Sequence, residues 1–476
     1  MAKILFTHSY FYLFDSKQWS FKQPYPPYAT LLVAAWMREK GHEVYLWDSN
    51  LQENTHSFVE KLEAIQPDFL VVYDDSFNYL TKMCLTTMRE ACFEMCKYGK
   101  KYKATVIVSS SDSTDHYEKY LQEGADIVIR GEAEQTLLEI IEKPTNLEHI
   151  RGVAYKTENE IKTTPKREIF KNLDILPIPA WDLVDMDAYR QIWEKHHGSF
   201  MLNIATTRGC PYKCNWCAKP IYGNRYNVRS PEKVVDEIKM LVERFDISNF
   251  WMCDDIFGLK PNWVQEFNKL IQENQLKIKY KIQSRVDLLL KEDTIDSLVA
   301  SGLYEVWVGA ESASQKILDA MDKGTKVEEI YQATHLLKAK GVRVAFFLQF
   351  GYLGETEEDI QKTIKMVEEL LPDNIGISVS YPLPNTKFYD IVKSQLTEKQ
   401  NWVDSDDLAM MYKATYAPQY YKYLHRYVHR VYRKAKHKHQ IQHNQTPFSK
   451  KMRSLMAYTY HAVIEKLEAG RLNLSK

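Results

Sequence analysis

Three cysteines lie close together near the middle of the chain. Cys210, Cys214 and Cys217 follow the spacing Cys-x3-Cys-x2-Cys, and no fourth cysteine lies nearby in the sequence. Three thiolates on a tight loop can hold three irons of a [4Fe-4S] cluster and leave the fourth iron open to a substrate or cofactor. Structural zinc usually takes four ligands in two separated pairs, so zinc fits this spacing less well. Three unrelated buried cysteines are the remaining interpretation.

Charged residues follow several of the apolar runs after this cluster. Asp254 and Asp255 come after one run, Arg285 after the next, and Glu311 after a third. Residues at the ends of neighbouring parallel strands can converge on one ligand. Carboxylates suit an ammonium group or ribose hydroxyls, and an arginine suits a carboxylate. Taken singly, each residue is also compatible with a surface salt bridge.

The first 145 residues alternate short apolar runs with amphipathic stretches, which predicts a parallel, doubly wound sheet. Ligands of such sheets bind at the carboxyl ends of the strands. Polar side chains stand at those ends, including His8, Asp74-Asp75-Ser76, Ser109-Ser110-Ser111 and Glu132. The predicted strands are 4–7, 43–47, 69–73, 105–109 and 127–130, and the predicted helices are 28–40, 57–65, 80–96, 116–123 and 134–141.

A second strand–helix series begins near residue 201 and fits a partial (β/α)6 barrel. Its predicted strands are 202–205, 249–252, 280–283, 305–308, 343–348 and 375–380, and its clearest helices are 231–244, 261–274 and 327–340. Beyond residue 400 the alternation stops, and 419–440 has the spacing of a basic amphipathic helix. We therefore expect an α/β protein with four parts, namely a domain at 1–145, a linker at 146–195, a barrel at 196–400 and a basic helical region at 401–476.

The composition is that of a folded globular chain. Of its 476 residues, 45% are hydrophobic and 26% are charged, which excludes disordered and fibrous classes. No apolar run reaches the length of a membrane span, and no signal peptide is evident, so we expect a cytoplasmic protein. The formal net charge is zero, yet the stretch 408–464 holds 11 Lys or Arg, 6 His and no acid. A solvated basic face is the simplest interpretation, with an anionic substrate, a membrane surface or RNA as alternatives.

The cysteine spacing, with Trp216 before the last cysteine, resembles the signature of the radical S-adenosylmethionine (radical SAM) superfamily. Later segments also resemble that family, including 251–257, 283–287, 308–314, 350–356 and 381–386. The resemblance implies a [4Fe-4S] cluster on Cys210, Cys214 and Cys217, and S-adenosylmethionine on its open iron. It implies that Asp254 or Asp255 meets the methionine amino group, that the segment with Ser284 and Arg285 meets the methionine carboxylate, and that Glu311 and Ser312 meet the ribose.

The N-terminal region resembles the cobalamin-binding domain that precedes many radical SAM barrels. The resemblance rests on Pro26-Pro27-Tyr28 with the residues after it, and on the segment 124–134. It implies a cobalamin site that we assign to His8, Ser109, Ser110 and Glu132. Two departures are visible, since no Asp-x-His-x-x-Gly motif supplies an axial His, and serines replace the usual Gly-Gly after the fourth strand. Serine hydroxyls could bond the corrin amides or block the pocket, and a domain that only packs on the barrel is the alternative.

Together these features resemble the group of anaerobic magnesium-protoporphyrin IX monomethyl ester cyclases and cobalamin-dependent radical SAM methylases. The resemblance implies reductive cleavage of S-adenosylmethionine and cobalamin-dependent methylation of an unactivated carbon on a small-molecule substrate. Oxidative cyclisation of a tetrapyrrole-like substrate without methyl transfer is the alternative, and a non-catalytic carrier is a third. The expected partners are the substrate and an electron donor such as flavodoxin or ferredoxin. We expect no nucleic-acid partner, and no catalytic residue is assigned.

Overall fold

The structure is a computed structural model that describes residues 1–77, 85–219, 221–396, 399, 401–442 and 447–476. Contacts within the chain divide it into two compact units. The first unit holds residues 1–211, 218–282 and 401–407, and the second holds 212–217, 283–400 and 408–476. Each unit is described by itself below.

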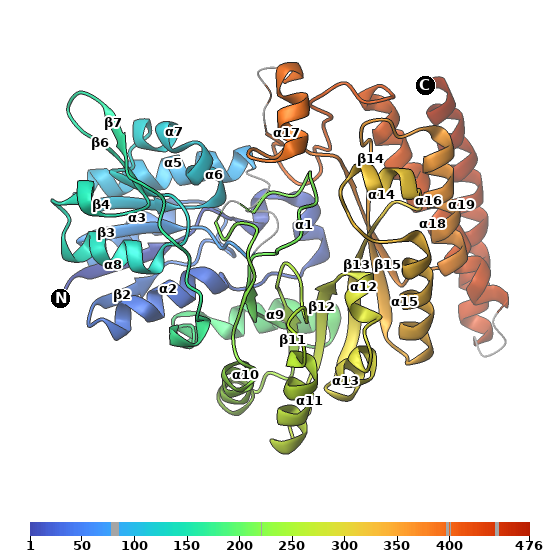
Figure 1. The fold of residues 1–476 in the computed structure, drawn as a ribbon, viewed down its shortest axis with the longest axis horizontal. Helices are drawn as coiled ribbons and strands as arrows, with labels where there is room; N and C mark the ends of the chain where they lie inside the picture. Colours follow the sequence, from blue (N-terminus) through green and yellow to red (C-terminus); the bar gives the residue numbers. More distant parts are fainter. Residues whose placement is uncertain (78–84, 220, 397–398, 400, 443–446) are drawn as a thin grey trace. The chain divides into compact units, whose positions relative to one another are not determined.

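The first unit opens with a sheet in the order β2-β1-β3-β4-β5-β6-β7, drawn at the blue end of the chain in Figure 1. Its first five strands pair in parallel, in the 2-1-3-4-5 order of flavodoxin-like sheets, which confirms the predicted fold class. These strands are rich in β-branched and aromatic residues and, apart from the half-buried β2, are almost wholly buried, as expected where helices cover both faces of a parallel sheet. These strands are β1 (Lys3–Thr7), β2 (Glu43–Leu46), β3 (Phe69–Tyr73), β4 (Thr105–Ser109) and β5 (Ile127–Ile129).

Two helix layers enclose this sheet. Helices α3 and α5 contact each other and form one layer, and helices α2 and α8 contact each other and form the other. The helices are α1 (Ser16–Phe21), α2 (Tyr28–Glu39), α3 (His56–Ile65), α5 (Thr86–Lys101), α6 (Ser111–Asp115), α7 (Tyr117–Gln122) and α8 (Glu134–Glu142), with the 3-10 turns η1 (Tyr12–Phe14) and η2 (Leu147–His149). Of the helix predicted at 80–96, residues 80–84 lie outside the described part of the chain.

The sheet continues past residue 145, where the sequence analysis placed a linker. A hairpin of β6 (Val153–Lys156) and β7 (Ile161–Thr163) adds two antiparallel strands to the edge beside β5. The hairpin is short, and β7 is mostly exposed, so it lacks the apolar run that marks the buried strands. The rest of the stretch 146–195 holds η3 (Leu173–Ile175), η4 (Trp181–Leu183) and most of α9 (Met186–His197). The four-part division of the chain stays a prediction.

The first unit also contains the start of the second strand–helix series. Strands β8 (Leu202–Ile204), β11 (Asn249–Met252) and β12 (Lys279–Ser284) pair in parallel, and the unit boundary falls within β12. Helices α10 (Pro231–Phe245) and α11 (Trp263–Glu273) follow the first two strands. A small antiparallel ribbon of β9 (Thr207–Arg208) and β10 (Asn227–Val228) was not predicted, because two-residue strands carry no periodic signal.

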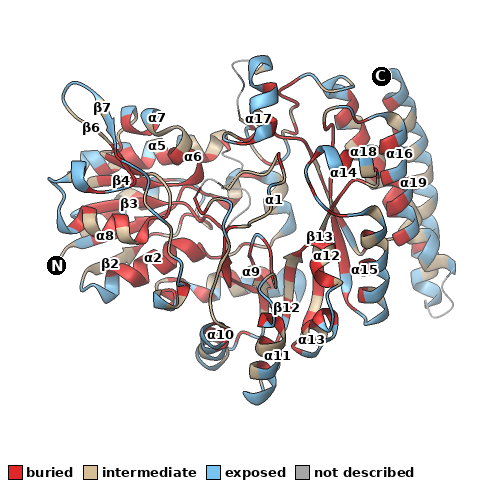
Figure 2. Ribbon diagram, viewed as in Figure 1, coloured by how far each residue is buried: buried red, intermediate tan, exposed pale blue. Residues whose placement is uncertain are grey.

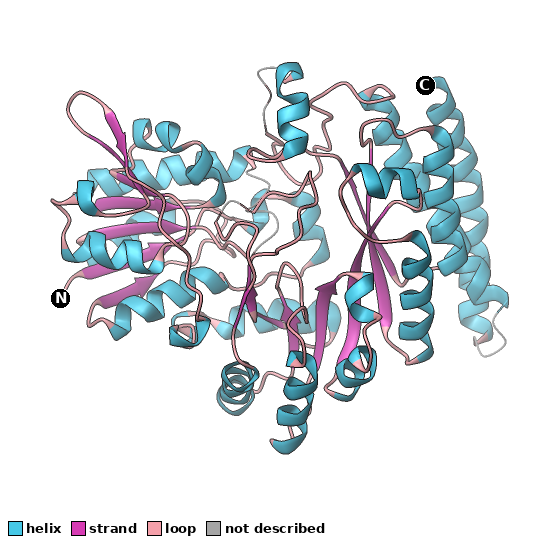
Figure 3. Cartoon of the chain, in the orientation of Figure 1, coloured by secondary structure: helices cyan, strands magenta, loops and turns pink. Residues whose placement is uncertain are grey.

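The second unit continues the series with β13 (Leu303–Glu311), β14 (Arg343–Phe350) and β15 (Asn374–Val379), which are parallel. The full strand order is β15-β14-β13-β12-β11-β8, and Figure 3 shows the strands with their helices. All six predicted strands of the series are therefore present. The helices are α12 (Val286–Leu289), α13 (Thr294–Ala300), α14 (Gln315–Ala320), α15 (Val327–Ala339), α16 (Glu357–Leu370) and α17 (Lys387–Val392), with the 3-10 turn η5 (Lys393–Gln395).

The chain ends in two long helices, α18 (Pro418–Gln442) and α19 (Phe448–Leu474), which confirms the helical C-terminal region. Helix α18 buries its apolar face, including Tyr420, Leu424 and Val428, against α16 and β15. Helix α19 contacts α18 along its length, and much of its outer surface is exposed (Figure 2). Among the described residues, none of the helices combines the length and apolarity that a membrane crossing requires.

Candidate functional site

The cysteine loop of the second unit is held by Asn215, a residue that the sequence analysis did not single out. Its side-chain amide donates to the Ala320 carbonyl at 2.6 Å, and its side-chain oxygen accepts from the Tyr352 hydroxyl at 2.8 Å. Its backbone bonds to the Met321 carbonyl and to the Phe388 amide. Asn215 lies between Cys214 and Cys217, so four hydrogen bonds fix the loop that carries both thiols.

The three cysteines suit soft metal ligation, because each is partly accessible and thiolates are the usual ligands of iron–sulfur clusters. Cys210 belongs to the first unit, whereas Cys214 and Cys217 belong to the second. Within the ranges that the structure describes, no three His, Cys, Asp or Glu side chains form a group ready to hold a metal ion. The role of the three cysteines as cluster ligands therefore stays a prediction.

A charged cluster in the second unit lies beside the cysteine loop. The Arg285 guanidinium stacks over the Tyr212 ring at 3.7 Å from its centroid. The same guanidinium donates to the Lys323 carbonyl at 2.7 Å and pairs with Asp287 at 2.9 Å. Arg285 and its neighbour Ser284 are both buried. The predicted ligand of the methionine carboxylate is thus placed against the loop that carries Cys214.

Glu311 forms a buried ion pair with Lys323 at 2.8 Å. Burial lowers the pKa of Lys323, but the charges of Glu311 and Cys214 outweigh it, so the pKa is raised overall. Glu311 has a φ of +55°, at a register shift of β13 that begins at Gly309. A Cβ atom at Gly309 would clash with the Lys323 ammonium and with a Glu311 carboxylate oxygen, so a side chain there would displace this pair. Lys323 had no signal in the sequence, because no motif or periodicity includes it.

The other candidates near these groups have partners of their own. The Ser312 hydroxyl lies 3.2 Å from the Thr363 hydroxyl and accepts from the Ser314 amide at 3.1 Å. These bonds brace the turn after β13. The Trp216 indole nitrogen is buried and has no hydrogen-bond partner within the described residues.

Asp254 and Asp255, both in the first unit, differ sharply in their burial. Asp254 is buried and accepts from the amides of Thr206 and Thr207, both at 2.7 Å, and from the Thr206 hydroxyl at 2.5 Å. Burial raises the pKa of Asp254 to about 6 despite these bonds. Asp255 is exposed. Asp254 therefore braces the loop after β8, and a role toward an amino group stays a prediction for both residues.

Arg208, two residues before Cys210, is a firmly anchored charge of the first unit and was missed by the sequence analysis. Its guanidinium pairs with Glu132 and Glu134 and stacks over the Tyr222 ring. Its side chain is only 3% exposed, and those of the two acids are 4% and 1% exposed. Burial raises the pKa of Glu132, and Arg208 opposes that rise. The Gly-Glu-x-Glu ending of the N-terminal domain thus fixes the strand that leads to Cys210.

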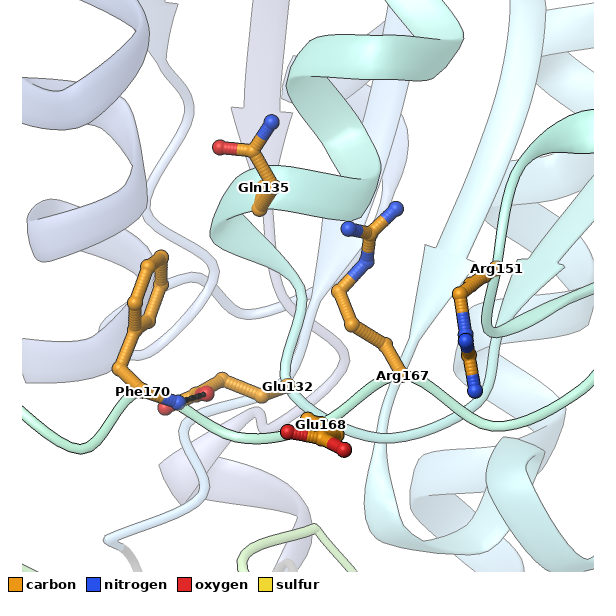
Figure 4. Close-up of a pocket in the computed structure, with 6 residues that line it drawn as sticks. All are labelled: Glu132, Gln135, Arg151, Arg167, Glu168 and Phe170. Atoms are coloured by element: carbon orange, nitrogen blue, oxygen red, sulfur yellow. Dashed lines mark hydrogen bonds between the residues drawn. The ribbon is translucent and has the colours of Figure 1, made fainter.

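Glu132 has a second partner, because its other carboxylate oxygen accepts from the Phe170 amide at 2.6 Å (Figure 4). Both oxygens are therefore used inside the protein, and a role of Glu132 toward cobalamin stays a prediction. A shallow surface pocket lies here, lined by Glu132, Gln135, Arg151, Arg167, Glu168 and Phe170. Its arginines already have partners, since Arg167 pairs with Glu139 and Arg151 donates to a backbone carbonyl.

His8 is buried and bonded at both ring nitrogens. Its Nε2 lies 2.8 Å from an Asp48 oxygen, and its Nδ1 lies 3.1 Å from the Ser49 hydroxyl. Although burial opposes it, the bonds from His8 and from the Tyr189 hydroxyl lower the pKa of Asp48. The His8 ring is therefore held as part of a structural network.

The polar residues after β3 also have structural roles. The Asp74 carboxylate accepts from the backbone and hydroxyl of Ser9 at 2.7 and 2.8 Å. The Asp75 carboxylate accepts from the amides of Tyr28 and Ala29, the first residues of α2. Asp75 thus caps a helix whose own N-cap, Pro27, has no side-chain acceptor. Burial raises the pKa of Asp75 to about 6.

The two serines assigned to the cobalamin site behave differently. Ser110 is the N-cap of α6, where its hydroxyl and that of Ser113 each accept from the other residue's amide in a capping box. The Ser109 hydroxyl is buried and has no hydrogen-bond partner in the described part of the chain. A buried hydroxyl without a partner is costly, so Ser109 is one of the groups at this sheet edge with unused hydrogen-bonding capacity.

Two segments of the chain match known families. Residues 204–367 match the radical SAM superfamily, and residues 19–141 match the B12 binding domain. The first match contains the cysteine loop, Arg285, Glu311 and Lys323, and the second contains Ser109, Ser110 and Glu132. His8 precedes the second match.

Two relatives extend over most of the chain. An uncharacterized methyltransferase from Pyrococcus horikoshii is 27% identical over 387 residues, covering 79% of this chain and 81% of the relative. The anaerobic magnesium-protoporphyrin IX monomethyl ester cyclase of Rubrivivax gelatinosus is 26% identical over 395 residues, covering 80% of this chain and 69% of the relative.

A solved structure shares the fold. The radical S-adenosylmethionine methyltransferase TsrM from Kitasatospora setae, solved with cobalamin and a [4Fe-4S] cluster bound, superposes with a TM-score of 0.68 and 18% identity. The superposition covers 83% of this chain and 75% of TsrM. The chain therefore carries a B12 binding domain ahead of a radical SAM domain, and it is an enzyme.

Proposed function

We propose that this enzyme methylates an unactivated carbon of a small-molecule substrate, with a [4Fe-4S] cluster, S-adenosylmethionine and cobalamin as cofactors. The observation that carries the proposal is the charged cluster of Arg285, Lys323 and Glu311 beside the Cys214 segment. When bound, these cofactors supply one-electron cleavage of S-adenosylmethionine and a transferable methyl group. The chain supplies binding, orientation and exclusion of water.

The residues fit these tasks in distinct ways. Cys210, Cys214 and Cys217 are the thiol donors for the cluster. Arg285 presents a buried guanidinium for the methionine carboxylate, in a geometry that Asp287 and the Tyr212 ring keep fixed. Ser284 and Trp216 belong to the same proposed pocket of the second unit, in which Glu311 and Ser312 bind the ribose. For the methionine ammonium we propose Asp254 or Asp255.

Cobalamin in this proposal binds at the carboxyl edge of the N-terminal sheet. Ser109 offers an unused hydroxyl there, Ser110 follows it directly, and Glu132 comes after the neighbouring strand β5. Both His8 ring nitrogens are engaged within the protein, which favours cobalamin bound without imidazole on cobalt. Electron paramagnetic resonance of the cob(II)alamin-loaded enzyme tests this point, because nitrogen superhyperfine splitting would contradict it. We further propose a cytoplasmic location and an electron donor such as flavodoxin or ferredoxin.

The test is anaerobic reconstitution with iron, sulfide and cobalamin, followed by incubation with S-adenosylmethionine that carries a deuterated methyl group. Mass spectrometry should detect 5′-deoxyadenosine, and a cell extract offered as substrate source should yield a product that carries the label. The variant with all three cysteines changed to Ala should lose the iron and form no deoxyadenosine. Cys92→Ala is the matched control, because it removes a buried thiol of α5 far along the sequence from the loop. Full iron content in the triple variant would contradict the cluster assignment.

Oxidative cyclisation without methyl transfer is the second candidate. It is favoured by the similarity to the Rubrivivax gelatinosus cyclase over 80% of this chain. The same experiment separates the two functions. Deoxyadenosine together with an oxidised, unlabelled product would support cyclisation, whereas label in the product supports methylation.

A further inference from the structure

Helix α19 turns an apolar face outward. Eight of the sixteen exposed large hydrophobic residues in the described part of the chain belong to this one helix. Scattered exposed hydrophobics are ordinary, but a set at helical spacing forms a continuous stripe. At 1.5 Å per residue the stripe is about 40 Å long. It consists of Phe448, Met452, Leu455, Met456, Tyr460, Val463, Leu467 and Leu474, which we call the α19 stripe.

The opposite face of α19 is polar and packs against α18. Ser454 and His461 are 3% and 8% exposed, and Glu468 is also buried. The Ser454 hydroxyl donates to Gln440 at 2.8 Å, and the His461 ring stacks on His437. Leu472 is the one large apolar residue among the four buried residues of α19, so the helix docks through a mainly polar face, the reverse of an ordinary surface helix.

An ion pair and a hydrogen bond fix this orientation. Lys434 of α18 pairs with Glu465 at 2.6 Å, and Arg430 lies 3.3 Å from the His461 ring nitrogen. Residues with higher numbers on α18 contact residues with lower numbers on α19, as Gln440 contacts Ser454 whereas Lys434 contacts Glu465. The two helices are therefore antiparallel. A rotation that buried the stripe against α18 would break these contacts and bury it against a basic helix. The outward stripe is thus a stable feature of the fold.

The charges that flank the stripe are cationic. Lys450, Arg453, Lys466 and Arg471 are exposed. The two acids of the helix are withdrawn, since the Glu465 and Glu468 side chains are only 16% and 8% exposed and each has a basic partner. A second copy of this helix would bring like charges together along the stripe. An apolar face bordered by cations instead complements a surface with anionic headgroups above hydrocarbon.

We propose that α19 binds the surface of an anionic lipid bilayer, with the stripe in the headgroup–acyl boundary and its flanking lysines and arginines on lipid phosphates. The helix lies parallel to the surface and does not cross it. This proposal does not depend on the reaction that the enzyme performs. It assigns a membrane-facing role to α19, which belongs to the basic C-terminal region and lies outside the radical SAM match.

The test is flotation of the full-length enzyme with phosphatidylcholine vesicles that contain or lack phosphatidylglycerol. We expect binding to the anionic vesicles only. The variant Met456→Gln/Val463→Gln/Leu467→Gln keeps good helix formers and adds no charge, and it should lower vesicle binding by at least about tenfold. Leu336→Gln is the matched control, because Leu336 is an exposed leucine of α15 outside the stripe. Circular dichroism verifies that the helices persist in both variants.

Three outcomes would overturn the proposal. The first is an unmodified enzyme that fails to bind anionic vesicles. The second is binding that the triple Gln variant retains in full, which would assign it to the basic charges alone. The third is an unmodified enzyme that sediments as a dimer and a triple Gln variant that sediments as a monomer, which would make a second copy the occupant of the stripe.

Discussion

The strand ends of the N-terminal sheet and those of the second unit carry similar residues but use them differently. At the N-terminal sheet, polar groups are mostly bonded to the protein itself, as Asp75 caps α2, Ser110 caps α6 and His8 pairs with Asp48. In the second unit, Arg285 and the Glu311–Lys323 pair gather beside the cysteine segment. Polar residues at a strand end are therefore ambiguous in a sequence, because capping a helix and binding a ligand require the same side chains.

The largest expected effect tests whether the N-terminal charges are structural. Arg208→Met should lower the free energy of unfolding by about 3–5 kcal/mol, because it leaves Glu132 and Glu134 buried without their cation. Urea unfolding followed by circular dichroism measures it. The control is Arg38→Met, which removes an exposed pair with Asp182 and should cost less than about 1 kcal/mol. Equal losses in the two variants would show that the Arg208 anchor is unimportant.

The next effect tests whether the charges of the second unit bind a ligand. Arg285→Ala and Glu311→Ala should each weaken S-adenosylmethionine binding by roughly ten- to a hundredfold, the value of a buried charge-assisted hydrogen bond. Iron content should be unchanged. Equilibrium dialysis with labelled S-adenosylmethionine measures the affinity. Arg343→Ala, at an exposed arginine that pairs with Glu305, is the control and should bind normally. Normal affinity in both test variants would place the cofactor elsewhere.

The sequence predicted the strands of both series because buried parallel strands are continuous apolar runs. It also indicated the cysteines, Arg285 and Glu311 as site residues, because they belong to short local motifs, and their roles stay predictions. Asn215, Arg208 and Lys323 were missed because their partners are distant along the chain, as in the bond from Asn215 to Ala320. The hairpin β6–β7 was missed because it is short and largely exposed. Local patterns thus identify strands and motif residues, whereas residues that bond to distant parts of the chain become visible only in the fold.

Glu355 is a buried acid of the second unit for which the described residues supply no ion-pair partner, in contrast to Glu132 and Glu134. One oxygen accepts from the Gly351 amide at 2.6 Å, the other has no partner among the described residues, and burial raises the pKa to about 8. The folded state therefore keeps a proton that the unfolded state releases above about pH 4.5, so stability falls as pH rises toward 8.

Glu355→Gln should remove this dependence. Its stability relative to the unmodified enzyme should rise by about 2 kcal/mol between pH 6 and pH 8. Thermal unfolding across this pH range measures the change. Glu358→Gln, at an exposed acid of α16, should leave the pH profile unaltered. A Glu355→Gln profile parallel to that of the unmodified enzyme would mean that Glu355 is ionised in the folded protein.

The smallest effect separates a capping residue from a ligand within two adjacent serines. Ser110→Ala removes an N-cap and should cost about 1 kcal/mol of unfolding free energy, while bound cobalamin is retained. Ser109→Ala removes a buried hydroxyl without a partner, so the cobalamin-free protein should be as stable as before or slightly more stable. If the corrin amides use this hydroxyl, cobalamin retained through gel filtration, read from its visible absorbance, should fall in Ser109→Ala alone. Equal cobalamin retention in the two variants would instead show that the serines, which stand where Gly-Gly is usual, serve only the turn into α6.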